Sequence, residues 1–161
     1  MLDVGTKAPA FTLPGAGGET GLDELLADGP ALLAFFKATC PTCQISFPVW
    51  GELARRHGDT VRFVAISQSP LPDAVTFLDE YDAPMPALDD IATGFTASAA
   101  YDLDTVPTLV LVDRDGSIVH VTQGWDRDAA NDWDVRLAAL SGREPSPVST
   151  EGDGRPVFKP G

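Results

Sequence analysis

The sequence predicts an α/β fold in which a central mixed β-sheet is flanked by helices. Residues 31–36 form a continuous apolar run, residues 41–56 carry apolar residues at helical spacing, and residues 60–67 form a second apolar run. A strand, a helix and a strand of these lengths indicate a right-handed βαβ unit with parallel strands. A third strand over 106–113, followed by an antiparallel return over 117–122, makes the sheet mixed.

The chain ahead of the first core strand is rich in glycine and proline. Residues 3–21 should form a loop with one short extended piece at 10–13, in which Phe11 and Leu13 face a core. Residues 21–27 place leucines on one side and should form a short amphipathic helical turn. This part of the chain is therefore expected to cover the sheet rather than to build it.

The apolar run at 31–36 and the helix after it form the centre of the predicted fold. All six residues of the run are apolar, which indicates a strand buried on both faces. The helix should begin at Pro41, since a proline at the first helical position loses no hydrogen bond, and end at Gly58. Pro48 lies inside it and should kink it. Its inward-facing residues are expected to be Cys43, Phe47, Trp50 and Leu53.

The second half of the chain adds helices around the third strand. Residues 73–81 should form a helix, and residues 91–101 should be helical in their second half. The Asp-Gly pair within residues 114–116 is a strong hairpin signal. A final helix should run from a cap at Asp126 to about residue 140. Its apolar face is expected to hold Ala130, Trp133, Leu137 and Leu140.

The 161 residues fit one domain, at residues 1–142, followed by a C-terminal tail at residues 143–161. The tail holds prolines and glycines but no periodic apolar pattern, so we expect it to be largely disordered. Val157 and Phe158 are the side chains expected to pin it to the domain. The formal net charge of −13 argues against partners such as nucleic acid or an anionic membrane surface, because both bind positive charge.

The chain contains no segment that reads as a targeting or membrane signal. No apolar run approaches the roughly 20 residues that cross a bilayer, so we expect no membrane span. Residues 1–5 lack the basic and apolar regions of a signal peptide. We therefore expect a cytoplasmic protein. The alternative is an exported protein whose leader or anchor is absent from this sequence.

Cys40 and Cys43 are the only cysteines in the chain. Two cysteines at CxxC spacing, where a buried strand meets a helix N-terminus, are typical of a thiol–disulfide site. The free N–H groups and the positive end of the helix favour a thiolate at Cys40, whereas Cys43 lies one turn further in. We expect Cys40 to attack a substrate disulfide and Cys43 to resolve the mixed disulfide.

Two other interpretations of the cysteine pair were weighed. The pair can be two core cysteines at helical spacing without function, although the coincidence of strand, proline and helix speaks against this. It can also be half of a zinc site. Only His57 and His120 remain as nitrogen donors, at no recognisable spacing, so we expect no metal and no cofactor.

Four stretches of the sequence together resemble a known group of proteins. Residues 35–43, with Pro48 beyond them, resemble the active-site strand, motif and kinked helix of the thioredoxin superfamily. Residues 106–108, before an apolar strand, resemble the cis-proline loop of that superfamily. Residues 5–13 resemble the N-terminal segment shared by TlpA/ResA-type thiol-disulfide oxidoreductases and peroxiredoxins, the redoxin / AhpC-TSA-like group. Residues 86–118 also fit the insertion and hairpin of the TlpA type.

The resemblance implies a thioredoxin-like three-layer fold over about residues 5–140 and thiol-disulfide oxidoreductase activity. It implies that Pro107 is cis beside Cys40, and that the backbone of Val106 receives an extended substrate segment. Val106, Pro107 and Thr108 are therefore candidate substrate-binding residues. The implied partners are a disulfide-containing protein or small molecule as substrate, and an upstream dithiol or disulfide redox partner.

The sequence also departs from the superfamily pattern. Ala34 stands where many thioredoxins carry a buried acid, so another residue or water must carry the proton of Cys43. Lys37 replaces a small residue; it either favours the Cys40 thiolate through its ammonium group or is a solvated lysine at a strand end. The other candidate modulators, at the helix start, are Thr39 in place of the usual tryptophan, Pro41 and Thr42.

Two further functions compete with disulfide exchange. One is a thioredoxin-dependent peroxidase of the peroxiredoxin type, in which Cys40 attacks a peroxide. Peroxiredoxins carry a threonine three residues and a proline seven residues before the reactive cysteine, whereas Lys37 and Leu33 stand there in this chain. The other is a non-catalytic thioredoxin-like binding module. The sequence leaves open whether the pair acts as a reductant or an oxidant, since related sites span roughly −270 to −120 mV.

Overall fold

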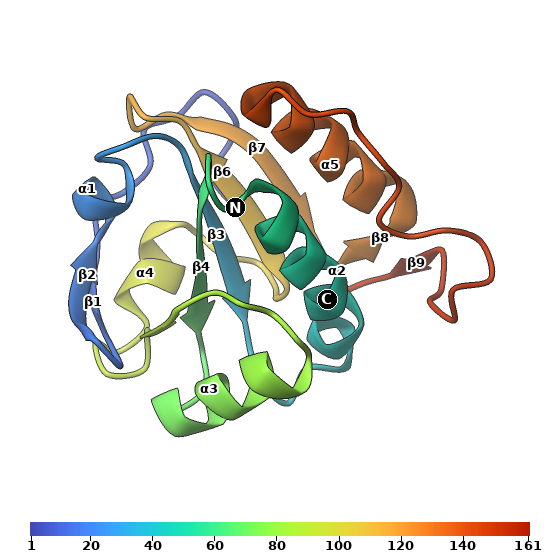
Figure 1. Cartoon of the computed structure of the whole chain (residues 1–161). Coiled ribbons are helices and arrows are strands. Elements are labelled where there is room, and N and C mark those ends of the chain that lie inside the picture. The colour runs from blue at the N-terminus through green and yellow to red at the C-terminus, as the bar shows by residue number, and fades with distance from the viewer.

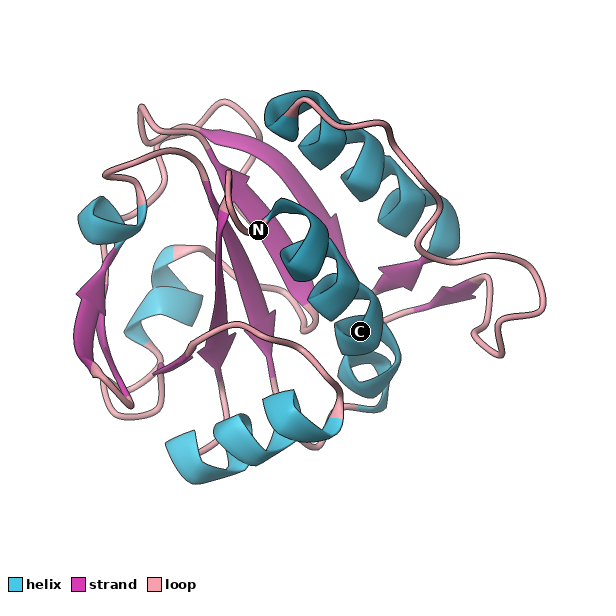
Figure 2. Cartoon of the chain, in the orientation of Figure 1, coloured by secondary structure: helices cyan, strands magenta, loops and turns pink.

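The computed structural model describes residues 1–161 and contains a seven-stranded sheet with helices on both faces (Figures 1 and 2). The strands lie in the order β2-β1-β5-β4-β3-β6-β7, and two further strands, β8 and β9, form a separate ribbon. The strands are β1 Thr12–Gly15, β2 Gly18–Gly21, β3 Ala31–Phe36, β4 Arg62–Ser67, β5 Ala87–Asp89, β6 Thr108–Val112, β7 Ile118–Gln123, β8 Trp125–Asp126 and β9 Phe158–Lys159. The helices are α1 Leu22–Leu25, α2 Pro41–His57, α3 Leu71–Glu80, α4 Thr96–Ala100 and α5 Arg127–Ser141. The predicted α/β fold with a mixed central sheet is confirmed.

The pairing of the strands confirms the predicted βαβ unit. β3 and β4, joined by α2, are parallel, and β4 and β5 are parallel as well. β6 pairs antiparallel with the other edge of β3, and β7 returns antiparallel beside β6. β3 therefore lies inside the sheet, between strands of opposite direction.

β3 is buried on both faces, as its apolar run predicts. None of its six residues has any exposed surface. Its even-numbered residues belong to the core beneath α2, α3 and α5, and its odd-numbered residues to the core beneath α1 and α4. This alternation follows from the two-residue period of a strand. β3 thus joins the two cores and ends at Phe36, four residues before the first cysteine.

The structure also contains strands that the sequence did not predict. β1 and β2 form a hairpin within the expected loop of residues 3–21, and β5 has only three residues. Each is too short, and too rich in glycine or proline around it, for a two-residue period to be recognised. Phe11 and Leu13 are buried, as expected.

The last helix differs from its prediction at one position. Leu140, expected on the buried face of α5, is 48% exposed, whereas Trp133 and Leu137 are buried. The residue one turn beyond Leu137 on the inner face is Ser141, whose hydroxyl lies 2.7 Å from a ring nitrogen of His57. The helical period of 3.6 residues selects position 141 rather than 140 here.

The C-terminal residues 143–161 follow a defined path beside α5, in contrast to the disorder expected of them (Figure 1). The side chains of Val157 and Phe158, expected to pin this tail, are 64% and 59% exposed. The backbone holds the tail instead, because β9 pairs antiparallel with β8. Polar contacts of this kind need no apolar period, which is why the sequence pattern did not reveal them.

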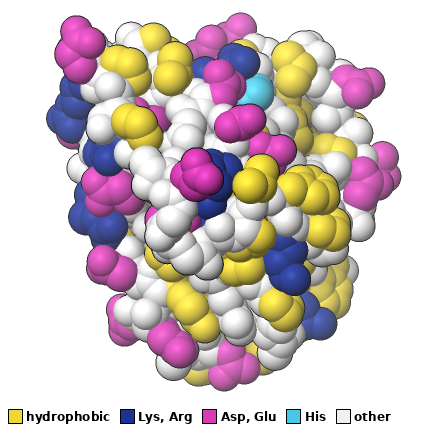
Figure 3. Space-filling view, turned by 90° about the vertical axis from the view of Figure 1, so that its right-hand side faces the viewer, with side chains coloured by type: hydrophobic (Ala, Val, Ile, Leu, Met, Phe, Trp, Pro, Cys, Tyr) yellow, Lys and Arg dark blue, Asp and Glu magenta, His cyan; other side chains and the backbone are white.

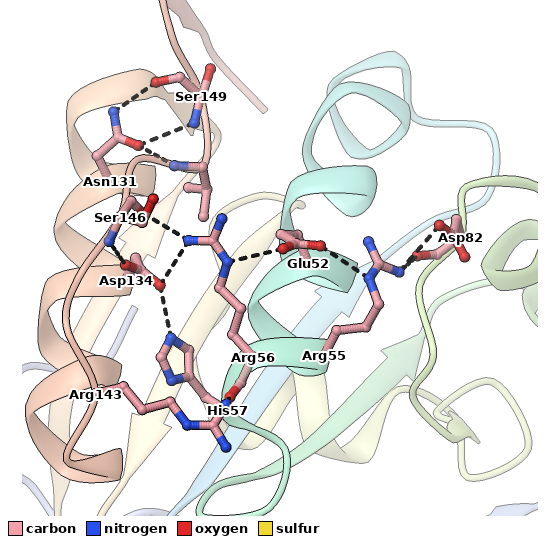
Figure 4. A network of polar contacts seen from close by, with 11 residues as sticks. Glu52, Arg55, Arg56, His57, Asp82, Asn131, Asp134, Arg143, Ser146 and Ser149 are labelled. Atoms are coloured by element: carbon pink, nitrogen blue, oxygen red, sulfur yellow. Dashed lines mark hydrogen bonds and ion pairs between the residues drawn. The ribbon is translucent and has the colours of Figure 1, made fainter.

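A buried polar network joins α2, α5 and the tail (Figure 4). The Nε2 atom of His57 lies 2.8 Å from Asp134, and the backbone N–H of Ser146 donates to the same carboxylate over 2.7 Å. Arg56 bridges Asp134 and the Ser146 carbonyl. Burial alone raises the pKa of Asp134, but the hydrogen bonds from His57, Ser146 and Arg56 outweigh it and hold that pKa below its ordinary value. The carboxylate is therefore the charged centre of the network.

The negative charge of the protein does not gather on the face formed by α5 and the tail. Figure 3 shows this face with acidic and basic side chains interspersed among apolar ones. The helices are short or polar throughout: none is both long and apolar enough to cross a membrane.

Candidate functional site

Cys40 and Cys43 lie where the chain passes from β3 into α2. Cys40 is the N-cap of α2, with extended backbone angles, and Pro41 is the first helical residue. The backbone N–H of Cys43 donates to the Sγ atom of Cys40 over 3.2 Å. Both thiols are free; Cys40 is half-buried and Cys43 has no exposed surface. Cys40 is therefore the member of the pair that solvent reaches.

The loop before β6 lies against Cys40. Its Val106–Pro107 peptide bond is cis, as the family resemblance implies, and the Cys40 thiol donates to the Val106 carbonyl over 3.6 Å. Thr108 pairs with Phe35 of β3, which brings this loop and the cysteine pair to the same end of the sheet. Thr108 is buried and its hydroxyl donates to a carbonyl of the loop, so it holds the loop in place.

The surroundings of Cys40 lower its pKa to about 6. The largest cause is the hydrogen bond from the Cys43 side chain, while partial burial acts in the opposite direction. The backbone N–H groups of Cys43 and Thr42 and the charge of Lys159 lower the pKa further. The first N–H groups of a helix have no partner within the helix, so they are available to an anion at this position. At neutral pH Cys40 is therefore largely a thiolate.

Cys43 has the opposite tendency. Burial raises the pKa of its thiol, and the neighbouring Cys40 raises it further. A thiol is a far weaker nucleophile than a thiolate. The two members of the pair therefore differ in reactivity: Cys40 is ready to react, and Cys43 is not until it loses its proton. Ala34, in the middle of β3, is fully buried, so that position offers no acid or base.

The predicted modulators take different places in the structure. Thr42 is buried, and its hydroxyl donates to the Pro160 carbonyl over 2.7 Å. Lys37 and Thr39 are exposed. The cation among the main causes of the low Cys40 pKa is Lys159, in the tail, rather than Lys37. Sequence reasoning missed Lys159 because nothing in a tail rich in proline and glycine indicated that it returns to the cysteines.

The two histidines considered as zinc donors have other neighbours. His57 lies in the network with Asp134, and His120 packs edge-on against Trp133 with ring centroids 4.5 Å apart. The structure brings together no three His, Cys, Asp or Glu side chains in a position to hold a metal ion.

The match that decides the family covers most of the chain. The sequence profile of the family described as Redoxin matches residues 3–135. The chain belongs to the Redoxin family. This redoxin is 30% identical over 118 residues to the methylamine utilization protein MauD of Paracoccus versutus, a match that covers 72% of this chain and 56% of that protein. The chain thus spans a little over half the length of this curated relative.

Solved structures confirm the thioredoxin-like fold of this redoxin. A putative thiol:disulfide interchange protein DsbE from Chlorobium tepidum superimposes with a TM-score of 0.77 at 26% identity, over 87% of this chain and 99% of that one. Peroxidoxin BcpB from Mycobacterium tuberculosis superimposes with a TM-score of 0.71 at 25% identity, over 89% of this chain and 99% of that one. Relatives with this family and fold are generally oxidoreductases.

Proposed function

We propose that this redoxin is a thiol-disulfide oxidoreductase in which Cys40 is the nucleophile and Cys43 the resolving thiol. The observation that carries the proposal is the position of Cys40 at the start of α2, half-buried, with a pKa of about 6, in front of a buried thiol. The likeness to a protein named for thiol:disulfide interchange supports the same conclusion.

The reaction follows from the difference between the two thiols. The Cys40 thiolate attacks one sulfur of a client disulfide; that S–S bond breaks, and the client's other sulfur leaves as a thiolate and takes a proton. Cys43 then loses its proton and attacks Cys40. The Cys40–Cys43 bond forms, and the second client thiolate leaves. Two electrons pass from the dithiol to the client, and the reverse sequence oxidises a client dithiol.

The loop before β6 supplies the place for the client's backbone. The N–H of Val106 donates no backbone hydrogen bond within the chain, and the Val106 carbonyl accepts only from Cys40 and the adjacent Thr105 hydroxyl. An extended client segment can pair with these groups, as extended segments pair with exposed strand edges. Val106 and the cis Pro107 are therefore proposed to bind the client. A protein or small dithiol upstream is proposed to return the pair to its starting state.

The test separates the roles of the two cysteines. Reduced protein is mixed with insulin, and free thiols and covalent adducts are followed. Cys43→Ser is expected to accumulate an adduct through Cys40 that dithiothreitol releases, whereas Cys40→Ser forms none. Loss of insulin reduction in Cys43→Ser with no trapped adduct would count against the proposed roles.

Peroxidase chemistry is the second candidate, favoured by the likeness to a peroxidoxin and by the N-terminal segment shared with peroxiredoxins. Lys37 and Leu33 at the positions of the peroxiredoxin threonine and proline speak against it. The discriminating measurement is hydrogen peroxide consumption beside insulin reduction by the same preparation. Rapid peroxide turnover that Cys40→Ser abolishes would reverse the ranking.

A further inference from the structure

The last residues of the tail cross in front of the cysteine site. We call residues 146–155 the anchor and residues 156–161 the strap. The anchor runs beside α5, and the strap leaves it through β9 to end beside the first turn of α2 (Figure 1). The strap therefore ends at the elements that hold Cys40.

Polar contacts fix the anchor to the domain. Asp153 accepts from the Ser149 hydroxyl over 2.6 Å and from the Arg155 N–H over 2.9 Å. Ser149 and Val148 are held by Asn131 of α5, a contact drawn in Figure 4. Ser149 is buried and Val148 packs against the core beneath α5. The anchor is thus part of the folded domain.

The strap is held by its own backbone rather than by its side chains. The Pro160 carbonyl accepts from the Thr42 hydroxyl over 2.7 Å, and the Pro156 carbonyl accepts from the Trp125 indole N–H over 2.8 Å. Between them, Lys159 pairs with Trp125 in the β8–β9 ribbon. An extended segment of another chain offers the same backbone groups, so these positions can receive other sequences.

The end of the strap fills the space beside the Val106 carbonyl. A Cβ atom on Gly161 would overlap that carbonyl oxygen, which is also the acceptor of the Cys40 thiol. Gly124, on the opposite side, approaches so closely that a Cβ atom there would lie 3.0 Å from the Lys159 carbonyl oxygen. An extended segment that pairs with Val106 next to Cys40 must enter this same space.

We propose that the strap is an internal competitor that occupies the place of a client's extended segment, and that a client displaces it to reach Cys40. The inference rests on the disulfide-exchange function proposed above. It assigns the client a chemistry: an extended polypeptide that pairs with β8 and places a glycine against Val106.

The structure allows the strap to leave without unfolding the domain. β9 has only two residues, and an isolated ribbon of two short strands is marginal in water. Val157 and Phe158 are exposed, so their departure uncovers no core. The anchor keeps its contacts with α5, and the strap can therefore return after the client has gone.

A binding experiment tests the strap without requiring catalysis. A fluorescent peptide with the sequence of residues 155–161 is titrated with reduced full chain and with a variant that lacks residues 156–161, and anisotropy is recorded. We expect at least about fivefold tighter binding to the shortened variant, a difference of about 1 kcal/mol. A peptide carrying Gly161→Val should bind that variant more weakly. Equal affinity of the first peptide for both proteins would overturn the proposal.

A rate experiment tests the competition itself. Insulin reduction is divided by reduction of a small aromatic disulfide, so that any loss of the Lys159 charge affects both rates alike. The ratio should rise about fivefold without residues 156–161, and should also rise in full-length Thr42→Val, which keeps the strap but removes its hydrogen bond. Thr42→Ser retains the hydroxyl and is the matched control.

The full-length variant keeps the test decisive where the shortened one fails to fold. An unchanged ratio in Thr42→Val and in the shortened variant would reject the competition. If the full chain reduces neither substrate, the proposed function fails, whereas peptide binding still decides whether the strap occupies a peptide site.

Discussion

At the scale of single residues, two thiols three positions apart acquire different chemistry from their places on one helix. Cys40 precedes the first turn, where N–H groups without helical partners face its sulfur. Cys43 lies one turn further in, with no exposed surface. The spacing of the motif and the buried strand before it were enough to predict this difference, because both depend on local chain geometry.

The first prediction concerns the pH dependence of Cys40. Its thiolate is the reactive form, and its pKa is lowered to about 6. The rate of alkylation of the reduced protein by iodoacetamide should therefore be near its plateau at pH 8 and fall to half near pH 6. Cys43 should remain unmodified over this range, since its pKa is raised. A half-point near pH 8.5, the value of an ordinary cysteine, would contradict the assignment.

The second prediction concerns the cation that assists Cys40. Lys159→Ala should move the alkylation midpoint to higher pH, because the charge of Lys159 lowers the pKa of Cys40. The shift should stay below about one pH unit, since partly exposed charges contribute less than about 1 kcal/mol. Lys37→Ala is the matched control and should move the midpoint less. A larger shift in Lys37→Ala would return the role to the lysine next to the motif.

At the scale of elements, the contacts that hold α2 against α5 centre on a carboxylate far from the cysteines in sequence. Asp134 receives hydrogen bonds from His57 of α2 and from the backbone of Ser146 in the tail (Figure 4). The sequence showed a helix at each place, with an apolar face on each. It could not show which acid and which histidine meet, because that depends on how the two helices are placed against each other.

The third prediction tests this network. Asp134→Ala should lower the free energy of unfolding by about 3–5 kcal/mol, because it leaves Arg56, His57 and a buried N–H without their partner. Asp132→Ala, which removes a partly exposed ion pair on the same helix, is the control and should cost less than about 1 kcal/mol. Urea denaturation measures both. Similar losses in the two variants would contradict the central place of Asp134.

The same carboxylate gives stability a defined dependence on pH. The pKa of Asp134 is lowered in the folded state. Its contribution is therefore fully present above the unfolded value of about 3.9 and is lost as the pH falls through its lower folded pKa. In Asp134→Ala this part of the acid dependence should be missing.

At the scale of the whole molecule, the sequence predicted the centre of the fold better than its margins. β3, α2, β4 and the β6–β7 hairpin carry long apolar patterns and clear turn signals, and they lie close to their predicted positions. β5 and the β1–β2 hairpin are recruited by neighbouring strands, and no local pattern announces such pairing. The tail was the largest departure, because polar and backbone contacts hold it. The cysteine pair and the cis Pro107 loop were found from sequence, whereas Lys159 and the Thr42 contact depended on the path of the tail.

The fourth prediction concerns the unequal protection of the molecule's amides. β3 lies between two strands and two cores, so its amide hydrogens should exchange with solvent only when the whole domain opens, with free energies equal to that of global unfolding. The amides of β9, paired over two residues, should exchange by local opening and much faster. Hydrogen–deuterium exchange followed by NMR measures both. Equal protection of β3 and β9 would contradict this order.

The burial of β3 on both faces has a consequence for repeated turnover. The reactive sulfur lies four residues beyond the slowest-exchanging strand, while the segment that covers it belongs to the fastest-exchanging part of the chain. Clients can therefore come and go many times for each opening of the interior. The lifetime of the protein and the frequency of its reaction are thus set by different parts of the molecule.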